Sequence, residues 1–287
     1  MKKTYFTLII LVSVTFLLNA QELEKSLLWK VTGNGIDAPS YIFGTFHMLC
    51  PDDLVIPEKV EKAMEQSEQL VLELDFDDPQ IMLTIQQGMM FRDGTTAKDY
   101  LSEEEYKKVS DFFVNKMELP FAALVGIKPF FLSSMTILYF LDCQPVSIEQ
   151  KLTELAGKQG IEVVGLETVG EQLGFVDSIP LEDAAEMLLL SIDDENEMQG
   201  MTDELVAKYL EEDLLGLQVI LDRYMEEEYT EINDNLLVNR NRDWIPKIME
   251  IAGTQPSFIA FGAGHLTGEE GVIKLLRKEG YNVEPVY

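Results

Sequence analysis

The chain has 287 residues, of which 46% are hydrophobic and 25% are charged, as is usual for a folded protein with a full core. Its 51 acidic residues outnumber 22 basic ones and give a formal net charge of −29. Because such a field repels phosphate backbones and anionic lipid, we expect no nucleic-acid partner. We expect most acidic side chains on exposed helix faces.

The N-terminal segment, residues 1–20, has the layout of a secretory signal peptide. Two lysines precede a mostly apolar run over residues 5–18, and the small-residue sequence LNA ends at Ala20. We therefore predict cleavage after Ala20 and a periplasmic or secreted mature protein, residues 21–287, without stable membrane insertion. The alternative is an uncleaved anchor, for which the apolar run is short.

Six apolar runs rich in β-branched and aromatic residues predict strands. They are LLWKVTG (27–33), SYIFGT (40–45), QLVLELDF (69–76), IEVVGLE (161–167), SFIAFGAG (257–264) and YNVEPVY (281–287). Several are apolar on consecutive residues, which is typical of a sheet covered on both faces. We predict a single α/β domain with a central mixed sheet covered by helices. Helical lobes around residues 78–158 and 181–250 interrupt the strands, the first as a long insertion between sheet strands.

Two pairs with capping-box spacing directly follow predicted strands, Thr168 with Glu171 and Thr267 with Glu270. The first pair puts Glu167 at the point where a strand gives way to a helix. The second predicts a helix that begins at about residue 267. Ligands bind at the carboxyl ends of strands in open α/β sheets, so both positions point to one rim of the sheet.

The two histidines of the chain, His47 and His265, occupy the same Gly-x-x-His pattern. GTFH begins at Gly44 and GAGH begins at Gly262, each at the end of a predicted strand. A glycine lets backbone segments approach closely, and the imidazole is presented three residues later. Each histidine alone would more often be structural. Their repetition in one context favours a shared site.

Two further charged residues lie in apolar surroundings. Glu73 interrupts a predicted buried strand, which is costly unless the carboxylate is paired, protonated or bound to a metal. A structural pair with a basic residue is the alternative. Arg240 shares a helical stripe with Leu236 and Trp244, so its guanidinium either extends to the surface or is held inward toward carboxylates or a developing oxyanion. Asn241 is adjacent and could donate beside it.

The cysteines, Cys50 and Cys143, permit one disulfide in an oxidising compartment. The sequence does not show whether they reach the required Cα separation. Cys50, three residues after His47, could instead be a thiolate ligand, although no third cysteine supports this alternative.

The motifs GTFH and GAGH, with ELD, GLET..EQ and NRN between them, resemble the TraB/GumN family, the bacterial relatives of the Tiki proteases. The likeness runs from about Leu27 to Val286. It implies a fold related to the erythromycin-esterase and haem-binding ChaN-like group, and a divalent-metal-dependent peptidase activity. The family's functional positions fall on His47, His265, Glu73, Glu167, Arg240 and Asn241.

These residues predict an exported metal-dependent hydrolase, and the resemblance implies that its target is a peptide bond. His47, His265 and Glu73 would be ligands to Zn²⁺, Mn²⁺ or Co²⁺, and the sequence does not choose among these ions. Glu167 would act as general base toward a metal-bound water, although the roles of the two glutamates could be reversed. Arg240 would stabilise the oxyanion.

Two other classes of function stay open. The same rim could bind a peptide, a signal or haem without turning it over, which would make the chain a non-catalytic periplasmic binding protein. A metal-free esterase with a histidine base is a third possibility, weakened by the lack of a Gly-x-Ser-x-Gly elbow. Substrate and oligomeric state are not determined by the sequence.

Overall fold

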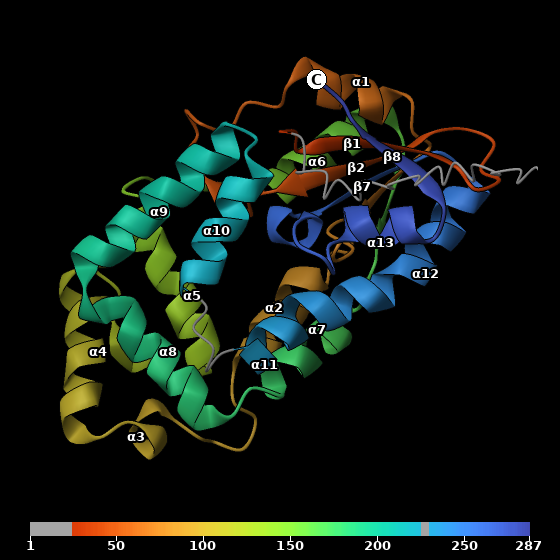
Figure 1. Cartoon of the computed structure of the whole chain (residues 1–287). Coiled ribbons are helices and arrows are strands. Elements are labelled where there is room, and N and C mark those ends of the chain that lie inside the picture. Colours follow the sequence, from red (N-terminus) through yellow and green to blue (C-terminus); the bar gives the residue numbers. More distant parts are fainter. Residues whose placement is uncertain (1–24, 225–229) are drawn as a thin grey trace, which may run out of the picture.

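The computed structural model describes residues 25–224 and 230–287. A six-stranded sheet lies at its centre, with strand order β6-β4-β7-β2-β1-β8 (Figure 1). The predicted signal peptide, residues 1–20, lies outside the described residues, and its cleavage stays a prediction. Within the described ranges, no helix is long and apolar enough to cross a bilayer.

The predicted α/β architecture is confirmed. The sheet strands are β1 Leu28–Gly33, β2 Ser40–Thr45, β4 Gln69–Leu72, β6 Glu162–Gly165, β7 Ser257–Gly262 and β8 Tyr281–Pro285. Neighbouring strands β6, β4, β7 and β2 are parallel, whereas β1 is antiparallel to both β2 and β8. The carboxyl ends of the four parallel strands therefore share one edge of the sheet.

Helices cover the sheet and form a lobe beside it (Figure 1). The α-helices are α1 Glu58–Glu65, α2 Ile81–Met89, α3 Ala97–Tyr100, α4 Glu103–Asn115, α5 Pro129–Phe140, α6 Ile148–Gln159, α7 Val169–Asp177, α8 Leu181–Asp193, α9 Glu195–Leu210, α10 Leu214–Tyr224, α11 Thr230–Asn233, α12 Asn239–Thr254 and α13 Val272–Lys278. Helices α2 to α6 form the predicted insertion between β4 and β6. A π-helical turn, Asp234–Val238, leads directly into α12.

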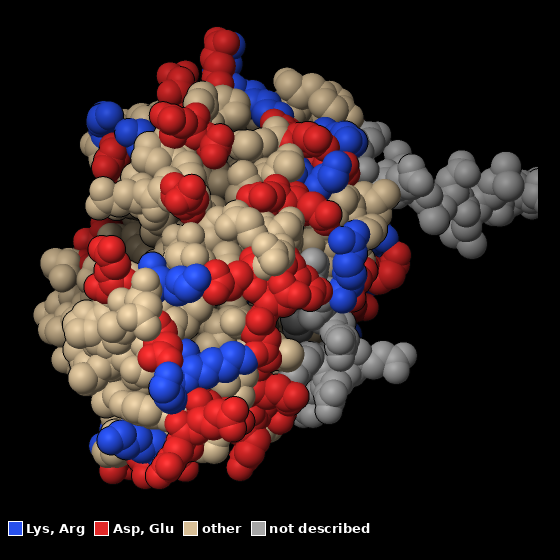
Figure 2. All heavy atoms as spheres, turned by 90° about the vertical axis from the view of Figure 1, so that its left-hand side faces the viewer, with Lys and Arg blue, Asp and Glu red and all other residues tan. Residues whose placement is uncertain are grey.

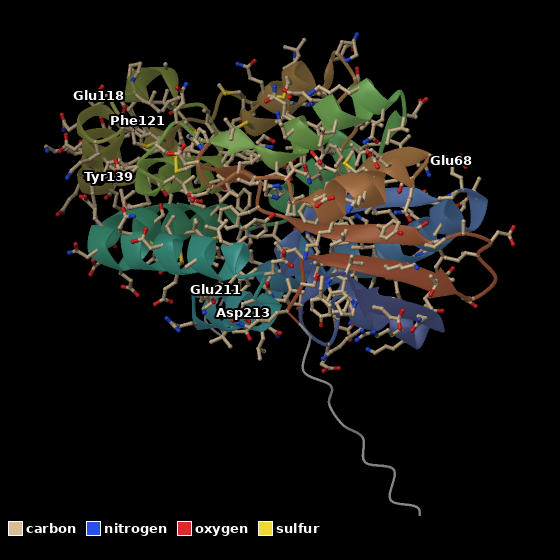
Figure 3. The ribbon with its side chains drawn as sticks, turned by 90° about the horizontal axis from the view of Figure 1, so that it is seen from above. Glu68, Glu118, Phe121, Tyr139, Glu211 and Asp213 are labelled. Atoms are coloured by element: carbon tan, nitrogen blue, oxygen red, sulfur yellow. A yellow bond between two sulfur atoms is a disulfide. The ribbon has the colours of Figure 1, made fainter. Side chains whose placement is uncertain are left out.

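The two largest hydrophobic clusters among the described residues lie in the sheet layer and in the lobe. The larger one packs around the sheet and includes Phe258 and Trp244. The second lies inside the helical lobe (Figure 3). Phe121 is buried in this cluster, and the partly buried Tyr139 packs against the cluster at its edge. Acidic side chains cover much of the outer face of this lobe, interspersed with fewer basic ones (Figure 2).

Two local predictions differ from the structure, and one element was not predicted. Glu73 lies directly after β4, which ends at Leu72, and not inside a strand. The pair at Thr168 does form a capping box at the start of α7, but the pair at Thr267 does not. The Thr267 hydroxyl donates to the carbonyl of Gly264 at 3.1 Å, and α13 begins only at Val272. A short two-stranded sheet, β3 Met48–Leu49 with β5 Val146–Ser147, was not expected at all.

Candidate active site

The two Gly-x-x-His motifs lie side by side. Strands β2 and β7 are parallel neighbours, with Thr45 opposite Gly262. A Cβ atom on Gly44 would lie 2.7 Å from Leu266 Cδ1 and 3.1 Å from Ala263 Cα. The close approach of the two motifs therefore requires glycine at position 44.

Replacing Gly44 by Ala is expected to lower the free energy of unfolding by about 1–3 kcal/mol, the usual cost of overpacking a dense core. The new methyl group would press on the Ala263 backbone, which cannot rotate away as a side chain could. Urea denaturation followed by circular dichroism would measure the loss. An unchanged unfolding midpoint would contradict this close packing.

His265 is buried and held by Asn241. Its Nδ1 lies 2.6 Å from Asn241 Oδ1, and its Nε2 lies 3.3 Å from Arg240 Nη1. Because a guanidinium nitrogen only donates, Nε2 is the acceptor and Nδ1 carries the proton. Burial lowers the pKa of His265 to about 3, so the imidazole is neutral. The ring also packs on Trp244, with 4.4 Å between ring centroids.

His47 lies at the solvent-exposed side of the site, where 64% of its side chain is exposed. Its Nδ1 lies 2.8 Å from Glu149 Oε1, and its Nε2 lies 4.0 Å from Glu73 Oε1. Partial desolvation by the surrounding protein opposes protonation of the ring, but the hydrogen bond and charge of Glu149, with the charge of Glu73, raise the pKa of His47 to about 9. Both histidines thus turn Nδ1 to a fixed acceptor.

Glu73 is buried between the two histidines. Its Oε1 accepts from the Gly262 backbone N–H at 2.9 Å. Its Oε2 accepts from Arg240 Nη2 at 2.5 Å and from Gln172 Nε2 at 3.1 Å. Burial alone would raise the pKa of Glu73, but the neighbouring His47 and Arg240 cations and the Gly262 N–H lower it to about 2. The carboxylate is therefore ionised.

Arg240 is held inward, and the alternative in which it extends to the surface does not apply. Its Nε and Nη2 donate to Glu167 Oε1 and Oε2, each at 3.0 Å. The indole N–H of Trp244 also donates to Glu167 Oε1, at 2.7 Å. Arg240 Nη1 donates to the carbonyl of Leu236 at 3.1 Å. Both oxygens of Glu167 are thus occupied by Arg240 and Trp244.

Gly262 borders the space that these groups share. A Cβ atom at Gly262 would lie 3.5 Å from both Glu73 Oε1 and His47 Nε2, and 3.7 Å from His265 Cδ2. The two imidazoles and the carboxylate therefore face one small volume, which a side chain at position 262 would fill. Among the described residues, no group of three or more His, Cys, Asp or Glu side chains is already arranged as a metal site.

Cavities flank this cluster without including it. One, of about 620 Å³, reaches Glu167 from the side of α2 and α7. Another, of about 690 Å³, lies between α2, α5, α7 and α8. Neither is lined by His47, Glu73 or His265. Of the three side chains His47, Glu73 and His265, only His47 is exposed to solvent.

Sequence reasoning missed two polar residues of the site, Glu149 and Gln172. Glu149 lies in the first turn of α6, where acidic residues are common because they complement the helix dipole. Gln172 lies in the first turn of α7 and belongs to the family motif GLET..EQ, but sequence reasoning assigned it no role. Glu149 carried no signal that separated it from a surface residue.

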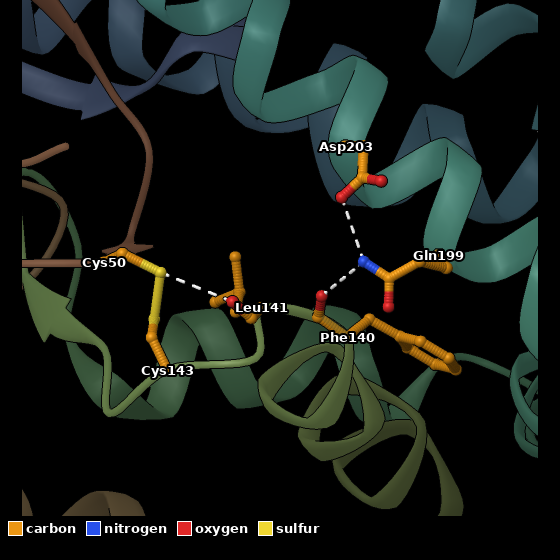
Figure 4. Close-up of a disulfide and its surroundings, with 6 residues drawn as sticks. All are labelled: Cys50, Phe140, Leu141, Cys143, Gln199 and Asp203. Carbon is orange, nitrogen blue, oxygen red and sulfur yellow. Dashed lines mark hydrogen bonds between the residues drawn. A yellow bond between two sulfur atoms is a disulfide. The ribbon is translucent and has the colours of Figure 1, made fainter. Parts of the chain in front are cut away.

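Cys50 and Cys143 are joined by a disulfide with a Cα–Cα distance of 5.8 Å (Figure 4). Cys50 immediately follows β3, and Cys143 lies just after α5. A bonded sulfur is not a thiolate, so the alternative of Cys50 as a metal ligand is wrong for this structure.

The sequence profile of the TraB/PrgY/gumN family matches residues 27–285. The chain belongs to the TraB/PrgY/gumN family. Two zebrafish (Danio rerio) proteins are similar to this family member. Metalloprotease TIKI2 is 25% identical over 92% of the chain, and Metalloprotease TIKI1 is 24% identical over 91%. The chain spans only 62% and 63% of the lengths of these relatives. No solved structure gives a significant match.

Proposed function

We propose that this TraB/PrgY/gumN family member is an exported metal-dependent hydrolase that cleaves peptide bonds in a peptide or protein substrate. His47, His265 and Glu73 would hold the divalent cation. The main support for the proposal is that these three side chains surround the position that a Cβ atom at residue 262 would occupy. The similarity to two proteins named metalloproteases supports a peptide bond as the target.

The residues present fit a cation. Imidazole nitrogen and carboxylate oxygen are ligands that suit Zn²⁺, Mn²⁺ and Co²⁺. Each imidazole has its Nδ1 bonded to an acceptor, Glu149 for His47 and Asn241 for His265, which is how proteins orient metal-binding histidines. Arg240 Nη1 can release His265 and keep its bond to the Leu236 carbonyl. A bound divalent cation supplies Lewis acidity and lowers the pKa of a bound water.

The remaining residues position these groups. Glu167 and Trp244 hold the Arg240 guanidinium in a buried, fixed orientation. In place of the base role expected from the sequence, we therefore assign Glu167 to orienting Arg240. Arg240 is a permanent cation beside Glu73, suited to stabilising negative charge that develops on a substrate oxygen. Asn241 fixes the tautomer of His265.

We also propose that the protein acts outside the cytoplasm. The Cys50–Cys143 disulfide is typical of oxidising compartments, and it agrees with the signal-peptide layout of residues 1–20.

Metal analysis and peptide cleavage by the wild type, His47→Ala and His265→Ala would test this function. We expect metal-dependent cleavage by the wild type. Both variants should lose more activity than the about 10–100-fold loss that follows when a residue supporting a metal ligand is replaced. Tight peptide or haem binding without turnover would instead establish a binding protein. Equal cleavage by all three proteins would remove the two-histidine site from the mechanism.

A further inference from the structure

A short ribbon sets the position of His47. His47 lies between β2 and β3, and β3 pairs with β5, with Met48 opposite Ser147 and Leu49 opposite Val146. Strand β5 leads directly into α6, whose second residue is Glu149. The pairing of β3 with β5 therefore brings His47 to Glu149, although the two residues are separated by 102 positions in the sequence.

Glu149 is itself fixed before it meets His47. Its Oε1 accepts from the Thr45 hydroxyl at 2.7 Å, and its Oε2 accepts from the Ser147 hydroxyl at 3.0 Å. The carboxylate is buried, and Thr45 and Ser147 belong to strands β2 and β5. The acceptor is thus held by the sheet and the ribbon, and His47 lies between Thr45 of β2 and the start of β3.

The ribbon is short and lies at the surface. It comprises only two residue pairs. Because even an isolated two-stranded hairpin is only marginally stable in water, we expect the pairing by itself to contribute little stability. Val146 is 39% exposed, and Val55, in the loop that follows β3, is 74% exposed. Leu49 of β3 is buried in the central cluster, but neither residue pair of the ribbon joins two buried apolar side chains.

The disulfide closes this ribbon. Cys50 directly follows Leu49 of β3, and Cys143 lies three residues before Val146 of β5. The covalent bond therefore joins the two strands at the end of the ribbon opposite His47 and Glu149.

We propose that the Cys50–Cys143 disulfide is a redox-dependent clamp that positions His47 in the active site. In the oxidised protein the ribbon is closed, so His47 stays on Glu149 with Nε2 toward Glu73. A dithiol reductant transfers two electrons and two protons, breaks the S–S bond, leaves two thiols and becomes a cyclic disulfide. The ribbon then opens and His47 leaves the site. The regulation of metal binding by this clamp rests on the function proposed above.

Ring-nitrogen NMR of the metal-free protein would test the positioning directly, because His47 and His265 are the only two histidines in the chain. The oxidised wild type, the wild type in dithiothreitol and Cys50→Ser/Cys143→Ser would be compared, with circular dichroism to verify folding. We expect the His47 signals to shift and broaden in the reduced wild type and in the double-serine variant, while the His265 signals stay unchanged. Unchanged His47 signals would overturn the clamp, as would equal changes at both histidines.

Calorimetric titration with Mn²⁺ or Zn²⁺ would test the consequence for the metal. We expect about 10–100-fold weaker binding in Cys50→Ser/Cys143→Ser and in Glu149→Gln, the size found for groups that orient metal ligands. Equal affinity in the double-serine variant and the oxidised wild type would overturn control of the site by the disulfide. If the oxidised wild type binds no metal, the proposed function fails, and the ring-nitrogen spectra alone decide whether the clamp exists.

Discussion

Replacing Arg240 by Met is expected to lower the free energy of unfolding by about 3–5 kcal/mol, because it leaves buried charges without their cation. Glu73 and Glu167 are both buried, and each accepts at least one hydrogen bond from the Arg240 guanidinium. Methionine has a similar length but no donor. Urea denaturation of the variant and the wild type would measure the difference.

Arg242→Met is the matched control on the same helix. Its side chain is 58% exposed and pairs with Glu270 at 3.1 Å, so its loss should cost only about 0–1 kcal/mol. The triple variant Arg240→Met/Glu73→Gln/Glu167→Gln removes the stranded charges and should recover part of the stability. Equal losses from the two arginine variants would show that the buried cluster does not depend on its cation.

Gly262→Ala is expected to abolish metal binding while it leaves the fold intact. The new methyl group would lie 3.5 Å from His47 Nε2 and Glu73 Oε1, which are ordinary contact distances without a clash. The φ angle of −49° also suits an L-residue, so the free energy of unfolding should change by no more than about 1 kcal/mol. The methyl group fills the space that the cation would occupy. The loss of metal affinity should therefore exceed the about 10–100-fold loss that follows when a residue supporting a metal ligand is replaced.

Calorimetric titration with Mn²⁺ or Zn²⁺, together with thermal unfolding, would measure both effects of Gly262→Ala. Gly253→Ala in α12 is the control, because nothing lies within 4 Å of the Cβ it would add. That variant should bind metal as the wild type does. Wild-type affinity in Gly262→Ala would place the cation elsewhere and would remove the main support for the proposed ligand set.

The sequence predicted the strands of the central sheet well, because continuous apolar runs between turn residues are a strong signal. It also predicted that His47, His265 and Glu167 lie at one edge of the sheet, since the carboxyl ends of parallel strands share that edge. The prediction failed where tertiary contacts decide local structure. Thr267 donates to a nearby carbonyl instead of capping a helix, because the Ala263–Leu266 turn brings that carbonyl within reach.

Other features of the site left no trace in the sequence. The β3–β5 ribbon is too short for a periodic pattern. Glu149 resembles an ordinary residue of a helical first turn, yet it is buried and binds His47. The engagement of both Glu167 oxygens could not be foreseen, because it depends on how α12 packs against the end of β6.

The neighbouring positions of β2 and β7 have a consequence for synthesis. One histidine motif follows the second strand of the chain, whereas its partner follows the seventh, at residues 257–262. A growing polypeptide on the ribosome therefore lacks half of the cluster until residue 265 has been joined. No stalled or truncated fragment that stops before His265 could assemble the two-histidine site.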